Sequence, residues 1–226
     1  MSEARQQIMK AIREGVQKAL LPGMAADHPP DTNPRGRGGV AEFVAEVERL
    51  SGQVIRVSSP VEASDAAASL FRKRGWDRVL AWEWGEIDCE GLPEALAGAG
   101  VAVVHGGDPA DLEPIPVGLT GAEAALADTG TIVVRNGPGR SPLASLLPPV
   151  HVVLLDARRV LPDMHTYFES LSAGGGAAEH VRASSNLVFI SGPSRTADIE
   201  QSLTLGVHGP RELIVILWEG TAPGGL

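Results

Sequence analysis

The 226-residue sequence has a single cysteine, Cys89. One cysteine excludes a disulfide within the chain, and it excludes an iron–sulfur cluster held by cysteines of this chain alone. The neighbouring carboxylates of Asp88 and Glu90 are expected to raise the pKa of the thiol, which opposes thiolate chemistry. Cys89 is therefore interpreted as incidental to function.

Long apolar runs are also missing. No stretch of about 18 apolar residues occurs, and the first residues lack the apolar region of a signal peptide, so we expect a cytoplasmic protein without a membrane span. The net charge of −9 disfavours nonspecific binding to nucleic acid or to anionic membrane surfaces. Because no helix concentrates Lys and Arg, DNA recognition is not expected.

The remaining composition is that of a globular protein, with 43% hydrophobic and 21% charged residues. Apolar segments with strand and helix periodicity alternate from residue 40 to residue 218, which predicts an α/β fold. We expect an N-terminal helical arm and flexible linker at 1–39, an α/β domain at 40–219 and a disordered tail at 220–226.

A polar cluster follows the apolar segment 115–119. Thr120 and Glu123 have the spacing of a capping box, which favours a helix start. Glu123 could instead be a carboxylate that faces a ligand and transfers protons. Asp128 could be only the acceptor of a turn. The candidate ligand-binding residues of this cluster are Thr120, Thr129 and Thr131.

A second polar run, 191–210, lies between two apolar segments, 186–190 and 212–218. Both segments are predicted strands, and a short helix between them would complete a βαβ unit. Loops at the carboxyl ends of such strands commonly bind ligands. The candidate ligand-binding residues in this loop are Ser191, Ser194, Arg195, Thr196 and Asp198.

Each residue of this run also has a structural explanation. Ser194 or Thr196 could cap the expected helix, and Asp198 could complement its dipole. Arg195 at a helix start favours an anion nearby, which it could hold through bidentate hydrogen bonds. His208 could be a turn residue or a general acid–base.

Two further patterns have weak functional interpretations. The segment 135–141 contains Arg135, Arg140 and no acid, which is typical of a solvated loop or of a flap over an anionic substrate. His165 and Glu169 share a helix face but have no third partner, so we interpret them as a surface pair and predict no metal site.

The two blocks 118–131 and 191–210 resemble the lactate-utilisation protein C family (LutC/YkgG, the LUD domain), and the resemblance covers roughly residues 40–218. It implies a three-layer α/β/α fold with a mostly parallel sheet, similar to ribose-phosphate isomerase, CoA-transferase and formyltetrahydrofolate cyclo-ligase. It also implies a role in bacterial oxidation of L-lactate to pyruvate with cysteine-rich iron–sulfur partner proteins. Iron–sulfur clusters would then lie on the partners, and no cofactor is predicted on this chain.

The alternative hypothesis is a stand-alone enzyme or sensor that binds a small anionic metabolite such as a carboxylate, phosphosugar, acyl-CoA or folate. Under this alternative, Glu123 and His208 would supply proton transfer and are the candidate catalytic residues. We expect the two blocks to share one pocket. Whether the domain itself is catalytic stays open.

Overall fold

The computed structural model describes residues 7, 9–11, 38–173, 184–197, 203–205 and 209–220, without the side chains of 172–173, 195–197 and 203–205. Residues 1–34 and 35–226 form two separate compact units. Only residues 7 and 9–11 of the first unit are described, and they are helical. Most of the predicted arm and linker at 1–39, and residues 221–226 of the predicted tail, lie outside the described residues.

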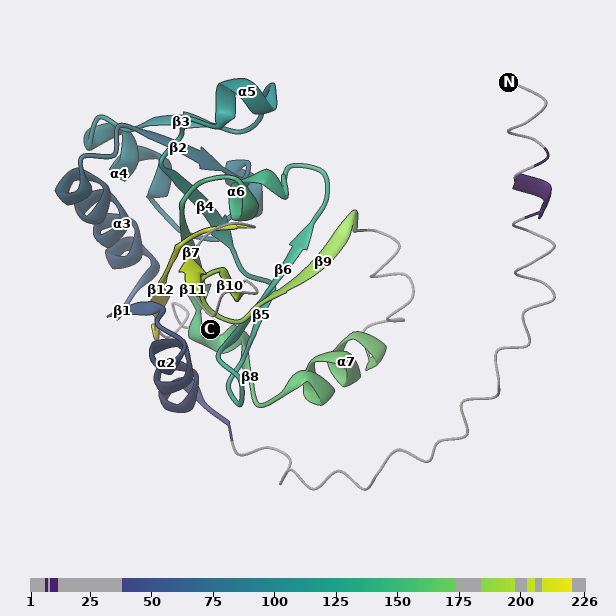
Figure 1. The fold of residues 1–226 in the computed structure, drawn as a ribbon. Helices are drawn as coiled ribbons and strands as arrows, with labels where there is room; N and C mark the ends of the chain where they lie inside the picture. The colour runs from purple at the N-terminus through teal and green to yellow at the C-terminus, as the bar shows by residue number, and fades with distance from the viewer. Residues whose placement is uncertain are drawn as a thin grey trace. The chain divides into compact units, whose positions relative to one another are not determined.

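The core of the second unit is a six-stranded parallel sheet with the strand order β1-β12-β7-β4-β2-β3 (Figure 1). Its strands are β1 (Gln53–Val57), β2 (Arg78–Ala81), β3 (Ala102–Val104), β4 (Val117–Gly121), β7 (Val150–Asp156) and β12 (Glu212–Trp218). The central strands β4 and β7 are buried along their whole length, as strands covered on both faces require. The predicted α/β fold with a mostly parallel sheet is therefore confirmed.

Helices α3 (Pro60–Arg74) and α4 (Leu92–Gly98) lie together on one face of this sheet, and α2 (Val40–Arg49) packs against β1. Helix α3 begins as its sequence predicts, because Ser59 accepts a hydrogen bond from the Glu62 amide and Pro60 occupies the first turn. It ends at Gly75, whose φ of 67° suits glycine, and it packs against α4 and β12.

Short helices lie in the connections between the strands. They are η1 (Trp84–Glu86), α5 (Pro109–Leu112), α6 (Leu143–Leu146) and η2 (Ala157–Arg159). Helix α6 contacts β4, β2 and β7. Through α3 and α4 the chain moves along the sheet from β1 to β2 and then to β3, whereas through α6 it moves the opposite way, from β4 to β7. Right-handed crossovers therefore place α6 on the face opposite to α3 and α4 (Figure 1).

A second sheet of four strands has the order β8-β5-β6-β9 and mixes parallel and antiparallel pairs. It contains β5 (Ala124–Leu126), β6 (Thr131–Asn136), β8 (Val160–Leu161) and β9 (Asn186–Ile190), and α7 (Met164–Ala173) packs against β5 and β8. Within the described ranges, no helix has the length and apolar content needed to cross a membrane.

Two local predictions are wrong. The described residues between β9 and β12 form no helix, because β10 (Arg195–Ala197) and β11 (Leu203–Leu205) pair as antiparallel strands, and β9 and β12 belong to different sheets. Thr120 and Glu123 cap no helix, since β4 continues through Thr120 and β5 begins at Ala124. Short helices are marginal without tertiary support, and strand pairing satisfies the same backbone groups here.

Candidate functional site

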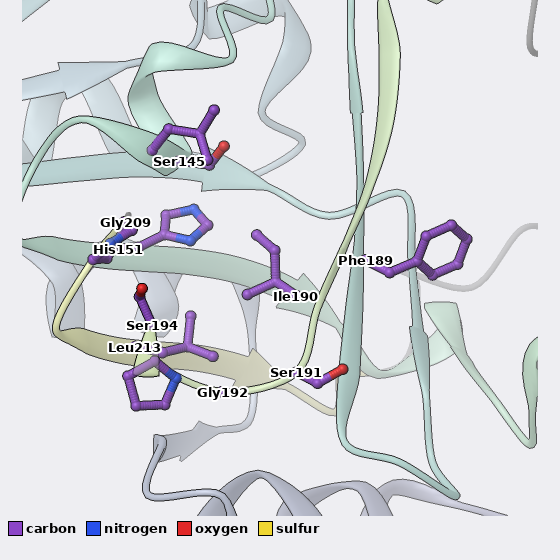
Figure 2. A pocket seen from close by; sticks show the side chains of 12 residues that line it. Ser145, His151, Phe189, Ile190, Ser191, Gly192, Ser194, Gly209 and Leu213 are labelled. Carbon is purple, nitrogen blue, oxygen red and sulfur yellow. The ribbon is translucent and has the colours of Figure 1, made fainter. Parts of the chain in front are cut away.

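A cavity of about 330 Å³ lies over the amino-terminal ends of the neighbouring strands β7 and β12. Its walls come from α6, from the starts of β7 and β12, from the end of β9 and the segment after it, and from the segment before β12 (Figure 2). The lining residues are Ser145, Leu146, His151, Phe189, Ile190, Ser191, Gly192, Pro193, Ser194, Gly209, Pro210 and Leu213. The volume lies in the range of small-molecule sites.

The position of the cavity differs from the general expectation for open α/β sheets. Ligands usually bind beyond the carboxyl ends of the strands, where the segment 191–210 was expected to lie. In this chain the cavity borders the second residue of β7 and the second residue of β12, His151 and Leu213. The cause is the path of the chain, because β9 leads from the mixed sheet back to the amino-terminal ends of these strands.

Gly118 allows α6 to pack close to β4 beside the cavity. A Cβ atom added at Gly118 in β4 would lie 1.7 Å from the carbonyl oxygen of Ala144 in α6. Only a residue without a side chain permits this approach of helix and strand. Gly118 is also the residue of β4 that pairs with His151, so the same contact fixes the helix beside the histidine.

His151 is the most unusual polar residue of the cavity wall. Its side chain is 1% exposed, and it lies on the central strand β7 between Gly118 and Leu213 of the adjacent strands. The Nε2 atom is 2.9 Å from the hydroxyl oxygen of Thr120. The Nδ1 atom is buried, and the described part of the chain offers it no hydrogen-bond partner.

Burial also determines the charge of this imidazole. It lowers the pKa of His151 to about 3, because the buried site disfavours the charged form. His151 is therefore neutral at physiological pH, and one of its nitrogens is a donor while the other is an acceptor. A neutral imidazole with one unpartnered nitrogen can bind a hydroxyl or carbonyl group, but it offers no charge to an anion.

The other polar side chains of the lining residues are serine hydroxyls. The Ser145 hydroxyl donates to the carbonyl oxygen of Pro142 at 3.1 Å, and the Ser194 amide donates to the carbonyl oxygen of Pro210 at 2.8 Å. The hydroxyl oxygens of Ser191 and Thr131 are 2.8 Å apart. Among the described lining residues, no side chain carries a charge.

The structure brings described members of the two sequence blocks together. Ser191 and Ser194 of the second block line the cavity, and Thr131 of the first block contacts Ser191. Thr129 extends this series of hydroxyl contacts, because the Thr131 hydroxyl donates to the hydroxyl oxygen of Thr129 at 2.8 Å. Thr120 lies directly behind His151. None of the three threonines is itself a lining residue.

The remaining candidates of the second block cannot be placed by their side chains. The backbone of Arg195 and Thr196 forms β10, and the side chains of both lie outside the described residues. Asp198 and His208 also lie outside the described residues. Their predicted roles in ligand binding and proton transfer stay predictions.

Glu123 lies in a different environment, outside the cavity wall. Its carboxylate forms an ion pair with Arg135 of β6 and accepts a hydrogen bond of 2.9 Å from the Tyr167 hydroxyl. Burial, together with the negative charge of Glu123, raises the pKa of Tyr167 well above its usual value. The three groups satisfy one another, an arrangement suited to joining the mixed sheet to α7. A catalytic role of Glu123 stays a prediction.

Both arginines of the segment 135–141 face carboxylates. Arg135 pairs with Glu123, and Arg140 pairs with Glu86 at 3.0 Å. The sequence segment contains no acid, but other segments supply one to each arginine. These pairs give the arginines a structural partner and weaken the interpretation of the segment as a flap over an anionic substrate.

The other sequence candidates occupy structural positions. His165 and Glu169 form an exposed surface pair 2.9 Å apart, and the described residues contain no group of three or more His, Cys, Asp or Glu that could hold a metal ion. Cys89 is buried near the Ser64 hydroxyl, and burial contributes more than Asp88 to the raised pKa of its thiol.

His151 is not among the candidate residues that the sequence indicates. The only sign in the sequence is one histidine inside an otherwise apolar strand, 150–155. Such a residue commonly forms internal hydrogen bonds, and nothing in the sequence shows that one ring nitrogen has no partner. The observation depends on the tertiary placement of α6 and of residues 189–194.

The fold and the site define a class, namely an α/β protein with a small, largely uncharged cavity at the amino-terminal ends of its central parallel strands. The chain belongs to the LUD domain family, whose model matches residues 40–218. The match covers both sheets and every described residue of the cavity wall.

Two relatives illustrate the similarity within this family. A lactate utilization protein C from Halalkalibacterium halodurans is 32% identical over 183 residues, which cover 76% of this chain and 79% of that protein. An uncharacterized protein from Neisseria meningitidis is 36% identical over 102 residues, 45% of this chain. The chain spans 42% of the length of that Neisseria protein.

One solved structure supports the fold. The crystal structure of a duf162 family protein from Deinococcus radiodurans has a TM-score of 0.57 and 20% sequence identity to this chain. The similarity covers 79% of this chain and 94% of that one. At this level of identity the comparison shows a shared fold and carries no information on the ligand.

Proposed function

We propose that this protein is a subunit of a bacterial L-lactate utilisation system and acts with iron–sulfur partner proteins in the oxidation of L-lactate to pyruvate. The observation that carries the proposal is the similarity to a lactate utilization protein C across most of both chains. The single buried cysteine is consistent with this division of labour, because a cluster with cysteine ligands would have to lie on a partner.

A purification from the native host tests this role. The tagged chain is isolated from cells grown on L-lactate and from cells grown on another carbon source, and co-purifying proteins are identified by mass spectrometry. We expect two cysteine-rich iron–sulfur proteins in near-stoichiometric amounts from the lactate-grown cells. Recovery of the chain alone from those cells would contradict the proposal.

A second candidate function is a stand-alone enzyme or sensor that binds a small metabolite. The cavity of about 330 Å³, lined by residues of the second sequence block, is the observation that favours it. In this alternative Arg195 of the same loop holds the anion, and the Arg195→Ala variant would bind it about 1.5–3 kcal/mol more weakly, the range for hydrogen bonds to charged groups. Calorimetry with L-lactate as the probe measures the difference, and an unchanged affinity would remove Arg195 from the site.

A further inference from the structure

One residue of the cavity wall, His151, has a buried ring nitrogen without a hydrogen-bond partner among the described residues. The Nδ1 atom of His151 is fully buried, and the ring is a lining residue of the cavity (Figure 2). A buried polar atom without a partner costs about 1–3 kcal/mol, so native proteins seldom keep one without a reason. A bound molecule that supplies the missing partner would be such a reason.

The other ring nitrogen limits how His151 can respond. Thr120 lies at hydrogen-bond distance from Nε2 and is itself fully buried on β4. This contact fixes the orientation of the ring against the sheet. If the threonine hydroxyl donates to Nε2, Nδ1 carries the proton and binds an acceptor. If Nε2 donates to the threonine, Nδ1 is an acceptor and binds a hydroxyl donor.

The surroundings of His151 define the rest of the ligand. The apolar part of the wall comes from Leu146, Ile190, Pro193, Pro210 and Leu213, whereas the Phe189 ring points away from the cavity and packs near Tyr167 (Figure 2). The hydroxyls of Ser145 and Ser194 are the other polar side chains of this wall, because the Ser191 side chain also points away and contacts Thr131. A charged group placed against this wall would lose its hydration without gaining a counter-charge from the described lining residues.

We propose that the cavity binds a small molecule with an apolar body and an uncharged oxygen, a hydroxyl or a carbonyl, which forms a hydrogen bond with Nδ1 of His151. His151 is then the residue that selects the ligand, and Thr120 is a positioning residue that holds the imidazole. The inference concerns this cavity alone and holds whether or not the chain works with iron–sulfur proteins.

Nuclear magnetic resonance of protein with ¹⁵N-labelled histidine tests the proposal. Four probes share one ring and differ in a single group, namely benzyl alcohol, acetophenone, benzoate and toluene. We expect benzyl alcohol or acetophenone to shift a His151 ring nitrogen signal saturably, and benzoate to bind more weakly than both. A saturable shift of the Nδ1 signal by acetophenone that toluene does not produce would assign the proton to Nδ1, because a ketone oxygen accepts but cannot donate.

Three variants provide the controls. His151→Phe keeps a ring of similar shape, and we expect it to bind the oxygen-containing probe about tenfold more weakly, the loss of one hydrogen bond, with toluene unaffected. If this variant fails to fold, the Thr120→Val/His151→Phe double variant replaces both hydrogen-bonding groups by apolar ones. The surface variant His165→Phe is the matched control and should bind like the wild type.

Three results would overturn the proposal. The first is the absence of any saturable shift of the His151 signals with all four probes. The second is tighter binding of benzoate than of benzyl alcohol and acetophenone, which would show a charged site. The third is unchanged affinity of the folded His151→Phe variant, or of the double variant, for the oxygen-containing probe. Loss of lactate utilisation in cells is a separate measurement and would bear on the proposed function alone.

Discussion

Two polar clusters of this protein differ in the hydrogen-bonding capacity that they leave unused. Glu123, Arg135 and Tyr167 form a charged cluster in which each group meets an opposite charge or a hydrogen-bond partner. His151 and Thr120 form an uncharged pair, and one ring nitrogen has no partner among the described residues. The first cluster joins parts of the fold to one another, whereas the second borders a cavity. Among the described residues, Asn136 Oδ1 and Arg140 Nε are also buried without a hydrogen-bond partner, but only the third such atom, Nδ1 of His151, belongs to a residue of the cavity wall.

The largest effect is expected at the cavity end of β4. In Gly118→Ala the new Cβ atom would collide with backbone atoms of Ala144, so α6 would have to move away from the sheet. We expect the free energy of unfolding to fall by about 3 kcal/mol or more, since backbone cannot yield as a flexible side chain can. Urea denaturation measures the change.

The other end of the same strand provides the matched control. A Cβ atom at Gly121 would find its nearest neighbour, the carbonyl oxygen of Glu86, at 3.5 Å, which is an ordinary contact. Gly121→Ala should therefore change the free energy of unfolding by less than about 1 kcal/mol. Equal losses in the two variants would show that the close approach of α6 is not specific to the cavity end.

The charged cluster should be important for stability. Glu123→Gln removes the charge that Arg135 and Tyr167 face, and both are partly or fully buried. We expect a loss of about 2 kcal/mol in the free energy of unfolding, the scale for hydrogen bonds to charged groups. Glu169→Gln, which affects the exposed pair with His165, should cost less than about 0.5 kcal/mol.

The Glu123→Gln variant also tests whether the charged cluster has a role beyond stability. A Glu123→Gln protein that keeps its stability but loses lactate utilisation would identify Glu123 as a functional group. That result would reverse the assignment of a structural role to the charged cluster.

Removal of the threonine tests the polar pair. Thr120→Val leaves both nitrogens of a buried imidazole without a side-chain partner, and we expect a loss of about 1.5 kcal/mol in the free energy of unfolding. In the Thr120→Val/His151→Phe double variant, both polar groups are gone, so the losses of the single variants should not add. Additive losses in a double-mutant cycle would show that the two residues do not interact.

A smaller effect is expected from pH. The pKa of His151 is about 3 in the folded protein and close to its ordinary value in the unfolded chain. Between these values the unfolded chain binds the extra proton, so the free energy of unfolding falls as the pH falls. From pH 6 to pH 5 this contribution is about 1 kcal/mol.

The His151→Phe variant isolates this contribution from that of the carboxylates. Its free energy of unfolding should depend on pH less steeply than that of the wild type over the same interval, and His165→Phe should behave like the wild type. Identical slopes for the wild type and His151→Phe would show that the folded-state pKa of His151 is not depressed.

Much of the fold could be predicted from local sequence patterns. The strands Gln53–Val57, Val150–Asp156, Asn186–Ile190 and Glu212–Trp218 form as expected, because apolar runs of this length suit buried strands. The caps of α3 are visible in Ser59, Pro60 and Gly75 for the same local reason. The mixed sheet and the β10–β11 hairpin could not be predicted, since their pairing joins segments that are distant in sequence or have no strong local preference.

The site was only partly predictable. Ser191 and Ser194 were found because polar residues are dense in their segment, and the structure places both at the cavity. Glu123 was singled out for its charge, but its partners Arg135 and Tyr167 arrive from β6 and α7 and cannot be paired with it by local spacing. His151 could not be identified from the sequence, because only the folded chain shows that its Nδ1 atom has no hydrogen-bond partner among the described residues.

The most direct test measures L-lactate consumption by the native host after deletion of this chain. We expect consumption to stop, and we expect the wild-type chain and the His165→Phe variant to restore it at equal protein abundance. The His151→Phe variant, folded and equally abundant, should fail to restore it if the cavity serves this pathway. Normal L-lactate consumption by the deletion strain would contradict a role of the protein in lactate utilisation.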